Sequence, residues 1–393
     1  GVSFAAIISA IDRICISIDF VSKLSETDEI TGSCLLICSM RRLSLIFMLK
    51  KFFERLTNWE LWPFAVIYFP ISFVWIWYMI RSRAFWFFTP SNPTIAFGGF
   101  EGEGKKEMYD QLPPHTVPRT IYIMHDLSFE KVKQILKDAG FTYPFIVKPD
   151  VGMKGILFRK IDTEDQLQKY HERIPVEYIV QDLIELPVEV SVFYYRHPSS
   201  AKGTVSGFIH KELLHVVGDG VHTLKELIEN HPRAKHRMLE MEHRHIHRFD
   251  RVIEADHIFY LSYAGNHNRG AHFTNLHTEI DERMHKVFDE LSHYSKHFYY
   301  GRYDIKTTSI EDLKEGKNFL ILEYNGCGAE PNHIYDCNMS LLNAYREILK
   351  HWKALYEISK YNHRNGYPYW SFQKGYQFLK QSQQHFRLLQ KYD

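Results

Sequence analysis

The sequence predicts an α/β (α+β) fold in which short apolar strands alternate with helices, preceded by a long uncharged hydrophobic segment. Two kinds of pattern support this prediction. Five strand-like runs, 144–150, 178–184, 188–193, 301–305 and 319–326, each place polar or charged side chains among apolar ones. A helix is expected over 129–139 with a stop at Gly140, and another begins at Leu341.

Composition limits the classes of protein to consider. With 393 residues, 45% hydrophobic and 15% aromatic, the chain can form two or three packed units and is not a disordered protein. Its 48 basic and 47 acidic residues give a net charge of +1, which argues against nucleic acid as the main partner. The five cysteines show no framework spacing, which indicates a reducing compartment.

Two runs in the C-terminal third carry oxygen ligands. Asp304 lies in Gly301-Arg302-Tyr303-Asp304-Ile305, and Glu323 and Asn325 lie in the next run, 319–326. Glu323 and Asn325 are two residues apart, so on a strand their side chains share a face. Mg²⁺ prefers such hard oxygen donors together with substrate phosphates, which makes Asp304, Glu323 and Asn325 candidate metal ligands. The alternative is a surface hairpin with a wet polar face.

A second candidate element is the apolar run 144–150, which delivers Lys148 beside the turn Val151-Gly152-Met153-Lys154-Gly155. Glycines let backbone N–H groups approach phosphate oxygens, and ammonium groups act on them as point charges. The alternative is a glycine-rich β-turn with an exposed lysine. Further along, the run that contains Gln181, Asp182, Leu183 and Ile184 could offer backbone groups to an adenine edge, and Glu189 opens a strand from which a carboxylate could reach ribose hydroxyls.

In this order, over residues 118–340, these elements resemble the ATP-grasp superfamily, and D-alanine–D-alanine ligases and cyanophycin synthetase within it. The likeness to the ligases rests on 301–304 and 323–325, and the likeness to cyanophycin synthetase on 216–228. It implies two α+β subdomains that grip ATP. It also implies roles for individual residues: phosphate binding by Lys148 and Lys154, an adenine pocket at Gln181, Asp182, Leu183 and Ile184, ribose binding by Glu189, two Mg²⁺ ions on Asp304, Glu323 and Asn325, and stabilisation of the reacting acyl group by Arg302.

The implied activity is ATP-dependent formation of a C–N bond between a carboxylate and an amine, both small molecules, through an acyl phosphate. The alternative is a membrane-attached ATP-grasp phosphotransferase or nucleotide-binding regulatory module, because both use the same phosphate grip. For Arg302 itself the alternative is an ion pair with Asp304. Two departures from the family pattern, Gln181 in place of the commoner Glu and the loop 326–331 in place of a Pro-Gly turn, argue against a D-alanine acceptor site.

The segment Leu61 to Ile80 contains no charged residue and is long enough to cross a hydrocarbon core. Five of the seven tryptophans lie between Trp59 and Trp86, as expected of anchors at a bilayer surface. Pro70 interrupts the segment, and basic residues flank both ends. We therefore expect a membrane-associated helical segment over 48–90, as a span, a re-entrant hairpin or an interfacial helix, with the catalytic domain on the cytoplasmic face of the membrane. A buried core helix is the alternative.

The remaining segments complete the expected domain order. Residues 1–47 are expected to be a non-native or unstructured extension, 91–117 a short region before the ATP-grasp domain, and 341–393 C-terminal helices. Within the short region, 94–97 is expected to form a strand.

The alternating histidines at 243, 245 and 247 are interleaved with arginines, which favours a basic strand over a metal site.

Overall fold

The computed structural model describes residues 57–153, 155–262, 270–335 and 339–393. The chain divides into two units, Gly1–Tyr68 and Phe69–Asp393. In the first unit, the described residues form the 3₁₀ helix η1 (Trp59–Leu61) and the short helix α3 (Phe64–Tyr68). The predicted extension 1–47 and the candidate phosphate ligand Lys154 lie outside the described residues.

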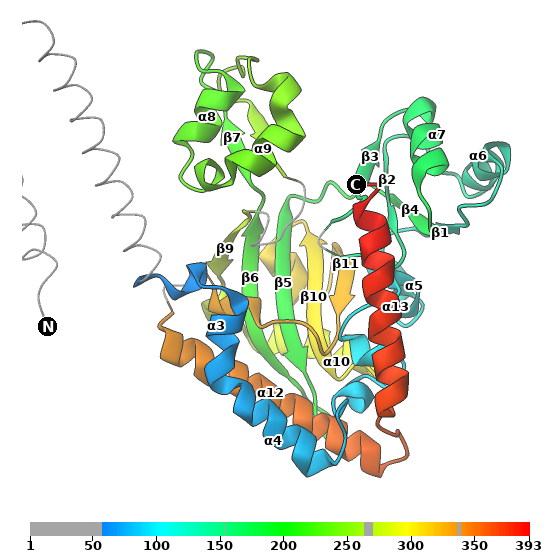
Figure 1. Ribbon diagram of the computed structural model, residues 1–393, viewed down its shortest axis with the longest axis vertical. Coiled ribbons are helices and arrows are strands. Elements are labelled where there is room, and N and C mark those ends of the chain that lie inside the picture. The colour runs from blue at the N-terminus through cyan, green and yellow to red at the C-terminus, as the bar shows by residue number, and fades with distance from the viewer. Residues whose placement is uncertain (1–56, 154, 263–269, 336–338) are drawn as a thin grey trace, which may run out of the picture. The chain divides into compact units, whose positions relative to one another are not determined.

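A four-stranded antiparallel sheet forms one part of the second unit (Figure 1). Its strand order is β1-β4-β2-β3, and helices α6, α7 and the C-terminal part of α13 (Phe372–Gln390) pack against it through a shared apolar core. The predicted helix with a glycine stop is confirmed, because Ser128 caps its first turn and Gly140 follows it with φ +70°. The elements are β1 (Thr120–Ile123), α6 (Phe129–Asp138), β2 (Phe145–Pro149), β3 (Arg159–Ile161), α7 (Glu164–Arg173) and β4 (Tyr178–Asp182).

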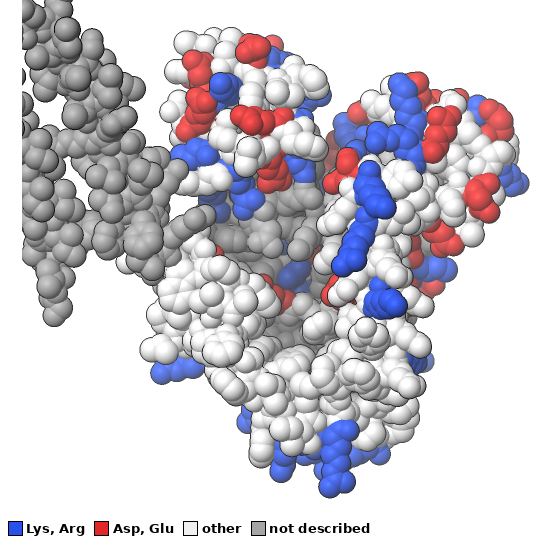
Figure 2. Space-filling view, viewed as in Figure 1, with Lys and Arg blue, Asp and Glu red and all other residues white. Residues whose placement is uncertain are grey.

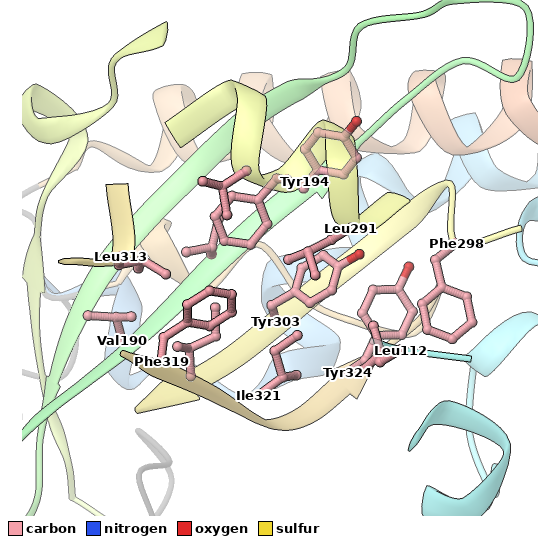
Figure 3. Close-up of a cluster of buried hydrophobic side chains, with 14 of the residues drawn as sticks. Leu112, Val190, Tyr194, Leu291, Phe298, Tyr303, Leu313, Phe319, Ile321 and Tyr324 are labelled. Atoms are coloured by element: carbon pink, nitrogen blue, oxygen red, sulfur yellow. The ribbon is translucent and has the colours of Figure 1, made fainter. Parts of the chain in front are cut away.

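A five-stranded antiparallel sheet, in the order β11-β10-β5-β6-β9, forms the larger part of the unit (Figure 1). The predicted strands at 188–193, 301–305 and 319–326 are confirmed. One face packs under helix α10 in an apolar core to which Val190, Phe288 and Tyr303 belong, and Figure 3 shows part of this cluster. The elements are β5 (Val188–Tyr195), β6 (Thr204–Glu212), β9 (His272–Asn275), α10 (Glu282–Ser295), β10 (Tyr300–Thr307), α11 (Ile310–Lys314) and β11 (Phe319–Asn325).

A small subdomain is inserted between β6 and β9 around its own apolar core. It contains β7 (His215–Val217), α8 (Leu224–Asn230), α9 (Met238–His245) and β8 (Ile258–Tyr260). The basic strand predicted at 241–248 is wrong, since this stretch forms the end of α9 and the 3₁₀ helix η7 (Ile246–Arg248). Helical spacing pairs Arg244 with Glu240 at 3.3 Å one turn away, which offsets the charge repulsion that the alternating pattern suggested.

The strand predicted at 94–97 is also wrong. Ala96–Gly99 forms a 3₁₀ turn, η4, in which Phe97 and Gly98 have φ of +53° and +69°, values that no strand allows. Phe97 is fully buried among aromatic rings, so tertiary packing holds this strained turn. Helix α5 (Lys105–Tyr109) follows segment 98–104, which contains four glycines.

Three further helices border the five-stranded sheet (Figure 1): α4 (Ser72–Ser82), α12 (Leu341–Arg364) and α13 (Phe372–Gln390). The predicted C-terminal helices are confirmed. Helix α4 packs on α12 through aromatic pairs, Trp75 with Trp352 at 5.1 Å between ring centroids and Tyr78 stacked on Tyr356 at 4.4 Å.

Candidate active site

The face of the five-stranded sheet opposite α10 carries a continuous set of polar and charged side chains. Residues directly opposite one another in an antiparallel ladder point to the same face. The register places Asp304 on β10 between Ser191 on β5 and Glu323 on β11. Two residues away on β10, Arg302 lies opposite Asn325 of β11. In the other direction, Lys306 lies opposite Glu189 of β5. The set on this face is Glu189, Ser191, Lys211, Arg302, Asp304, Lys306, Glu323 and Asn325.

Asp304 is the centre of this set and is buried. Its carboxylate lies 2.8 Å from Lys211 Nζ, 3.2 Å from Arg302 Nε and 3.2 Å from Asn325 Nδ2, and Ser191 Oγ donates to it as well. Burial acts to raise the pKa of Asp304, but Arg302 and Lys211 outweigh it and hold this pKa below its ordinary value. Asp304 is therefore an anionic group in a preformed polar network.

The ion pair that was the alternative for Arg302 is present. Arg302 donates from Nε and Nη2 to the two oxygens of Asp304, at 3.2 and 3.3 Å, and from Nη1 to the Glu330 carbonyl at 3.3 Å. Its side chain is 15% exposed and fixed by three contacts, so it is positioned at the edge of the site with little conformational freedom left to lose.

The charge of Glu323 interacts with two half-buried lysines, Lys148 and Lys105. Burial lowers the pKa of Lys148 on β2, and the charge of Glu323 opposes that shift. Burial also lowers the pKa of Lys105 at the start of α5. The charge of Glu323 opposes this shift, and the charge of Lys148 adds to it. Lys105 Nζ donates to the Asp150 carbonyl at 3.0 Å, which ties α5 to the loop after β2. Two ammonium groups beside a carboxylate form an electropositive position suited to an anion.

The predicted adenine segment lies at the end of β4. Gln181 is buried and donates to Tyr109 Oη and Thr120 Oγ1, both at 2.9 Å. The Asp182 side chain instead forms a partly exposed bidentate pair with Arg119, at 2.8 and 3.2 Å. Leu183 and Ile184 follow the strand and are partly exposed.

The Ile184 carbonyl accepts from Lys306 Nζ at 2.9 Å, which links this segment to β10. Glu189, the predicted ribose ligand, lies on the same face, 3.9 Å from Lys211 Nζ. Burial raises the pKa of Glu189, and Lys211 and Lys306 oppose that shift. The structure thus brings Gln181, Ile184 and Glu189 to the neighbourhood of the polar sheet face, whereas the Asp182 side chain is directed to Arg119.

Sequence reasoning missed Lys211 and Lys306. Lys211 has an almost fully buried side chain, and it comes from β6, which carried no functional prediction. A lysine near the end of an otherwise apolar strand was the available signal, the same signal that singled out Lys148. Lys306 continues the alternation of Arg302 and Asp304 on β10, so period-two counting would have placed it on the same face.

The donors on β10 and β11 fit a hard cation. Asp304 and Glu323 supply carboxylates, and the Asn325 side chain supplies an amide oxygen once the amide turns from Asp304. All three are oxygen donors, which favours Mg²⁺ over zinc or copper. These three residues are thus able to hold Mg²⁺ at the edge of the electropositive position.

No protein-family model matches the sequence, and no curated protein matches it. Among solved structures the chain is similar to a bifunctional glutathione synthetase from Pasteurella multocida (16% identity, 60% of this chain and 34% of that chain, TM-score 0.31). It is similar to a D-alanine–D-alanine ligase from Bacillus anthracis (14%, 65% and 68%, 0.35). It is also similar to the ATP-grasp ligase PsnB, solved with a minimal precursor, Mg and ADP (13%, 63% and 59%, 0.33).

The aligned region spans about a third of the glutathione synthetase and 59–68% of the other two proteins. A similarity at these TM-scores says nothing about activity or substrate. Conclusions about either rest on the side chains described above. The chain is similar to ATP-grasp ligases, the family that the order of its sequence elements resembles.

Proposed function

We propose that the protein is an ATP-dependent ligase that joins a carboxylate to an amine through an acyl phosphate. The observation that carries this proposal is the convergence of Asp304, Glu323 and Asn325 on one sheet face, beside Arg302, with the half-buried Lys148 and Lys105 interacting with Glu323. Anionic metal ligands next to several cations are what phosphoryl transfer requires, because its catalysis consists mostly of positioning and charge neutralisation.

The proposed reaction has two steps. A carboxylate oxygen of the first substrate attacks the γ-phosphorus of ATP, the bond from that phosphorus to the β,γ-bridging oxygen breaks, and ADP leaves. The amine nitrogen of the second substrate then attacks the acyl carbon, the C–O bond to phosphate breaks, and the amine loses a proton. The products are an amide, ADP and inorganic phosphate.

The side chains divide these tasks by charge. Lys148 and Lys105 lie where they can offset phosphate charge, and their lowered pKa values mean that a bound anion would stabilise their charged forms. Arg302 is held rigidly enough to donate to an oxyanion at the acyl carbon. Mg²⁺ held by Asp304, Glu323 and Asn325 would supply further neutralisation of the phosphate oxygens.

An isotope experiment tests the proposal. The protein is incubated with Mg-ATP and pooled amino acids, one set of which carries ¹⁸O in the carboxylate. A ligase releases ADP and phosphate only when donor and acceptor are both present, and the phosphate carries one ¹⁸O. A phosphotransferase would form ADP and a phosphorylated product without free phosphate, and a binding module would form neither, so both results contradict ligation.

Glu323→Ala should abolish turnover and leave the fold intact, because it removes a carboxylate from the sheet face without emptying the apolar core. The matched control is Glu290→Ala on the exposed side of α10, where the carboxylate is 68% exposed. Near-normal ATP consumption by Glu323→Ala, or equal losses in both variants, would contradict the assignment of Glu323 as a metal ligand.

We further propose that α4 attaches the protein to the cytoplasmic membrane surface, lying in the membrane plane. The stretch Phe64–Ser82 is long and apolar enough to cross a membrane, and only 11% of it is buried. One side of α4 packs on α12. A stripe on its other side is 46–68% exposed: Phe69, Phe73, Ile76, Trp77 and Ile80.

Packing and charge favour an in-plane position over a span. One side of α4 packs on α12 and is not available to lipid, so only the exposed side would contact a membrane, as in an interfacial helix. Arg81 and Arg83 are exposed at the C-terminal end of α4. In Figure 2 the surface over α4 is almost entirely uncharged, and the charges visible at its lower edge are basic. Aromatic and apolar side chains with basic neighbours suit an anionic lipid surface.

Flotation with vesicles of neutral and anionic lipids tests this attachment. Trp77→Glu should release the protein, whereas Leu239→Glu should not, although Leu239 on α9 is 85% exposed and equally apolar. Binding should persist in high salt, because screening weakens the arginines and not the apolar insertion. Equal flotation of both variants, or release of the wild type by salt alone, would contradict insertion of α4.

A further inference from the structure

On the same face of the five-stranded sheet, next to Phe193 and Tyr300, three metal-binding side chains meet in a buried cluster that the proposed reaction does not use. His333 lies on the 3₁₀ helix η10 (Asn332–Ile334), and Glu347 and His351 lie one turn apart on α12. One ligand atom from each lies within 4.8 Å of the other two. His333 and His351 are buried, and the Glu347 side chain is 21% exposed, which leaves a path to solvent.

The contacts in the cluster are too poorly directed for hydrogen bonds. Glu347 Oε1 lies 3.4 Å from His333 Nε2 and 3.2 Å from His351 Nε2, yet neither nitrogen has a hydrogen-bond partner among the described residues. His333 Nδ1 also has none within that part of the chain. Buried polar nitrogens are normally paired, so their convergence on one carboxylate oxygen requires an explanation.

The two carboxylate–imidazole distances match those between neighbouring ligands of a tetrahedral ion. With metal–ligand bonds of about 2.0–2.1 Å, neighbouring ligand atoms of a tetrahedral zinc site lie about 3.3–3.4 Å apart. We propose that His333, Glu347 and His351 bind a divalent transition-metal ion, with the fourth position open to water. Zinc is the ion that we expect. Two imidazoles and one carboxylate favour zinc and disfavour Mg²⁺.

The surroundings support ligation. His351 Nδ1 lies 3.5 Å from Tyr300 Oη, a contact that leaves Nε2 free to face the metal, and the Phe193 ring packs edge-on to the imidazole at 4.4 Å. Lys350 Nζ lies 3.4 Å from Glu347 Oε1, but its side chain is 54% exposed and can turn away to solvent.

The position of His333 is set by the backbone of β6. A methyl group at Gly207 would come within 2.0 Å of His333 Nδ1, so only glycine there allows the imidazole to reach α12. The ion would then bind η10 to α12. The segment between β11 and η10 contains Glu330, whose carbonyl accepts from Arg302, so the ion would hold in place the chain that supports this arginine.

Metal analysis of the full chain tests the proposal. Protein stripped with a chelator and supplied with zinc, then freed of loose metal, should retain about one ion per chain. Glu347→Gln and His333→Gln should lose it. Tyr300→Phe, which removes only an outer contact, should weaken binding about 10- to 100-fold. The matched control is His171→Gln, because His171 is equally buried but both of its nitrogens are hydrogen-bonded, to Tyr178 Oη and the Leu127 carbonyl.

Replacing zinc with Co²⁺ gives a visible absorption that reports on the metal site itself, and not merely on whether the protein is folded. Co²⁺ in the wild type should show the intense visible absorption of a tetrahedral site, lost in Glu347→Gln and kept in His171→Gln and Glu323→Ala. Retention in Glu323→Ala separates this site from the proposed Mg²⁺ site. A wild type without retained zinc, a Glu347→Gln variant that binds as the wild type does, or loss in His171→Gln would overturn the proposal. Should the ligand variants fail to fold, the cobalt spectrum of the wild type and the weakened binding of Tyr300→Phe decide it.

Discussion

Lys211→Met should destabilise the protein strongly, because one buried ammonium offsets two carboxylates. Lys211 Nζ lies 2.8 Å from Asp304 and 3.9 Å from Glu189, and only 4% of the lysine side chain is exposed. At an effective dielectric constant near 20, the shorter contact corresponds to about 6 kcal/mol of gross attraction. Part of this offsets the desolvation of the lysine, so we expect the free energy of unfolding to fall by about 3–5 kcal/mol.

Urea unfolding without nucleotide or Mg²⁺, followed by circular dichroism, measures this loss. The matched control is Lys133→Met, whose ammonium lies 2.9 Å from Glu130 and 3.1 Å from Glu164 on the surface, and it should cost less than about 1 kcal/mol. Adding Glu189→Gln to Lys211→Met should recover part of the loss, since it removes an unpaired acid. Equal costs for the two lysine variants would refute the buried ion-pair network.

Three further predictions concern the candidate site. Lys148→Met should weaken ATP binding in calorimetry by about 1.5–3 kcal/mol, the worth of a charge-assisted contact; unchanged affinity would remove Lys148 from the phosphate site. Asp182→Asn should leave ATP affinity within about twofold, because the carboxylate pairs with Arg119 and the segment is proposed to act through its backbone; a large loss would place the carboxylate in the pocket. Glu103 lies in the loop before α5, where its charge interacts with those of Glu323 and Lys105, and burial raises its pKa from 4.5 to about 7. The protonated form therefore contributes stability that is fully present below pH 4.5 and is lost as the pH rises through 7. The stability of Glu103→Gln relative to wild type should therefore increase from pH 5 to pH 8, by about 2–3 kcal/mol at most, in metal-free denaturation; a pH-independent difference would contradict the shift.

Local pattern was enough to predict the elements that carry the site. Strand alternation alone places Glu323 and Asn325 on one face and Arg302 and Asp304 on one face, and the structure has both arrangements. Local rules also predicted α6 and its stop at Gly140. These features depend on neighbours within a few residues, which the sequence displays directly.

Local pattern failed where distant contacts compete with it. The 94–97 segment has the composition of a strand, but burial of Phe97 among aromatic rings favours a left-handed turn. The histidine-rich stretch alternates as a strand would, but one-turn ion pairs and the core of the small subdomain favour a helix. Propensity differences are small, and such packing readily outweighs them.

The chain by itself thus determined which residue types stand on which strands, and therefore the kind of chemistry that the site can support. The tertiary structure alone decided which strands are neighbours, and so brought Lys211 to Asp304 and joined His333 to Glu347 and His351. It also decided that one side of α4 packs on α12 while the other stays exposed. The physical reason is that Coulomb attraction and desolvation depend on distance and burial in space, and neither quantity can be read from spacing along the chain.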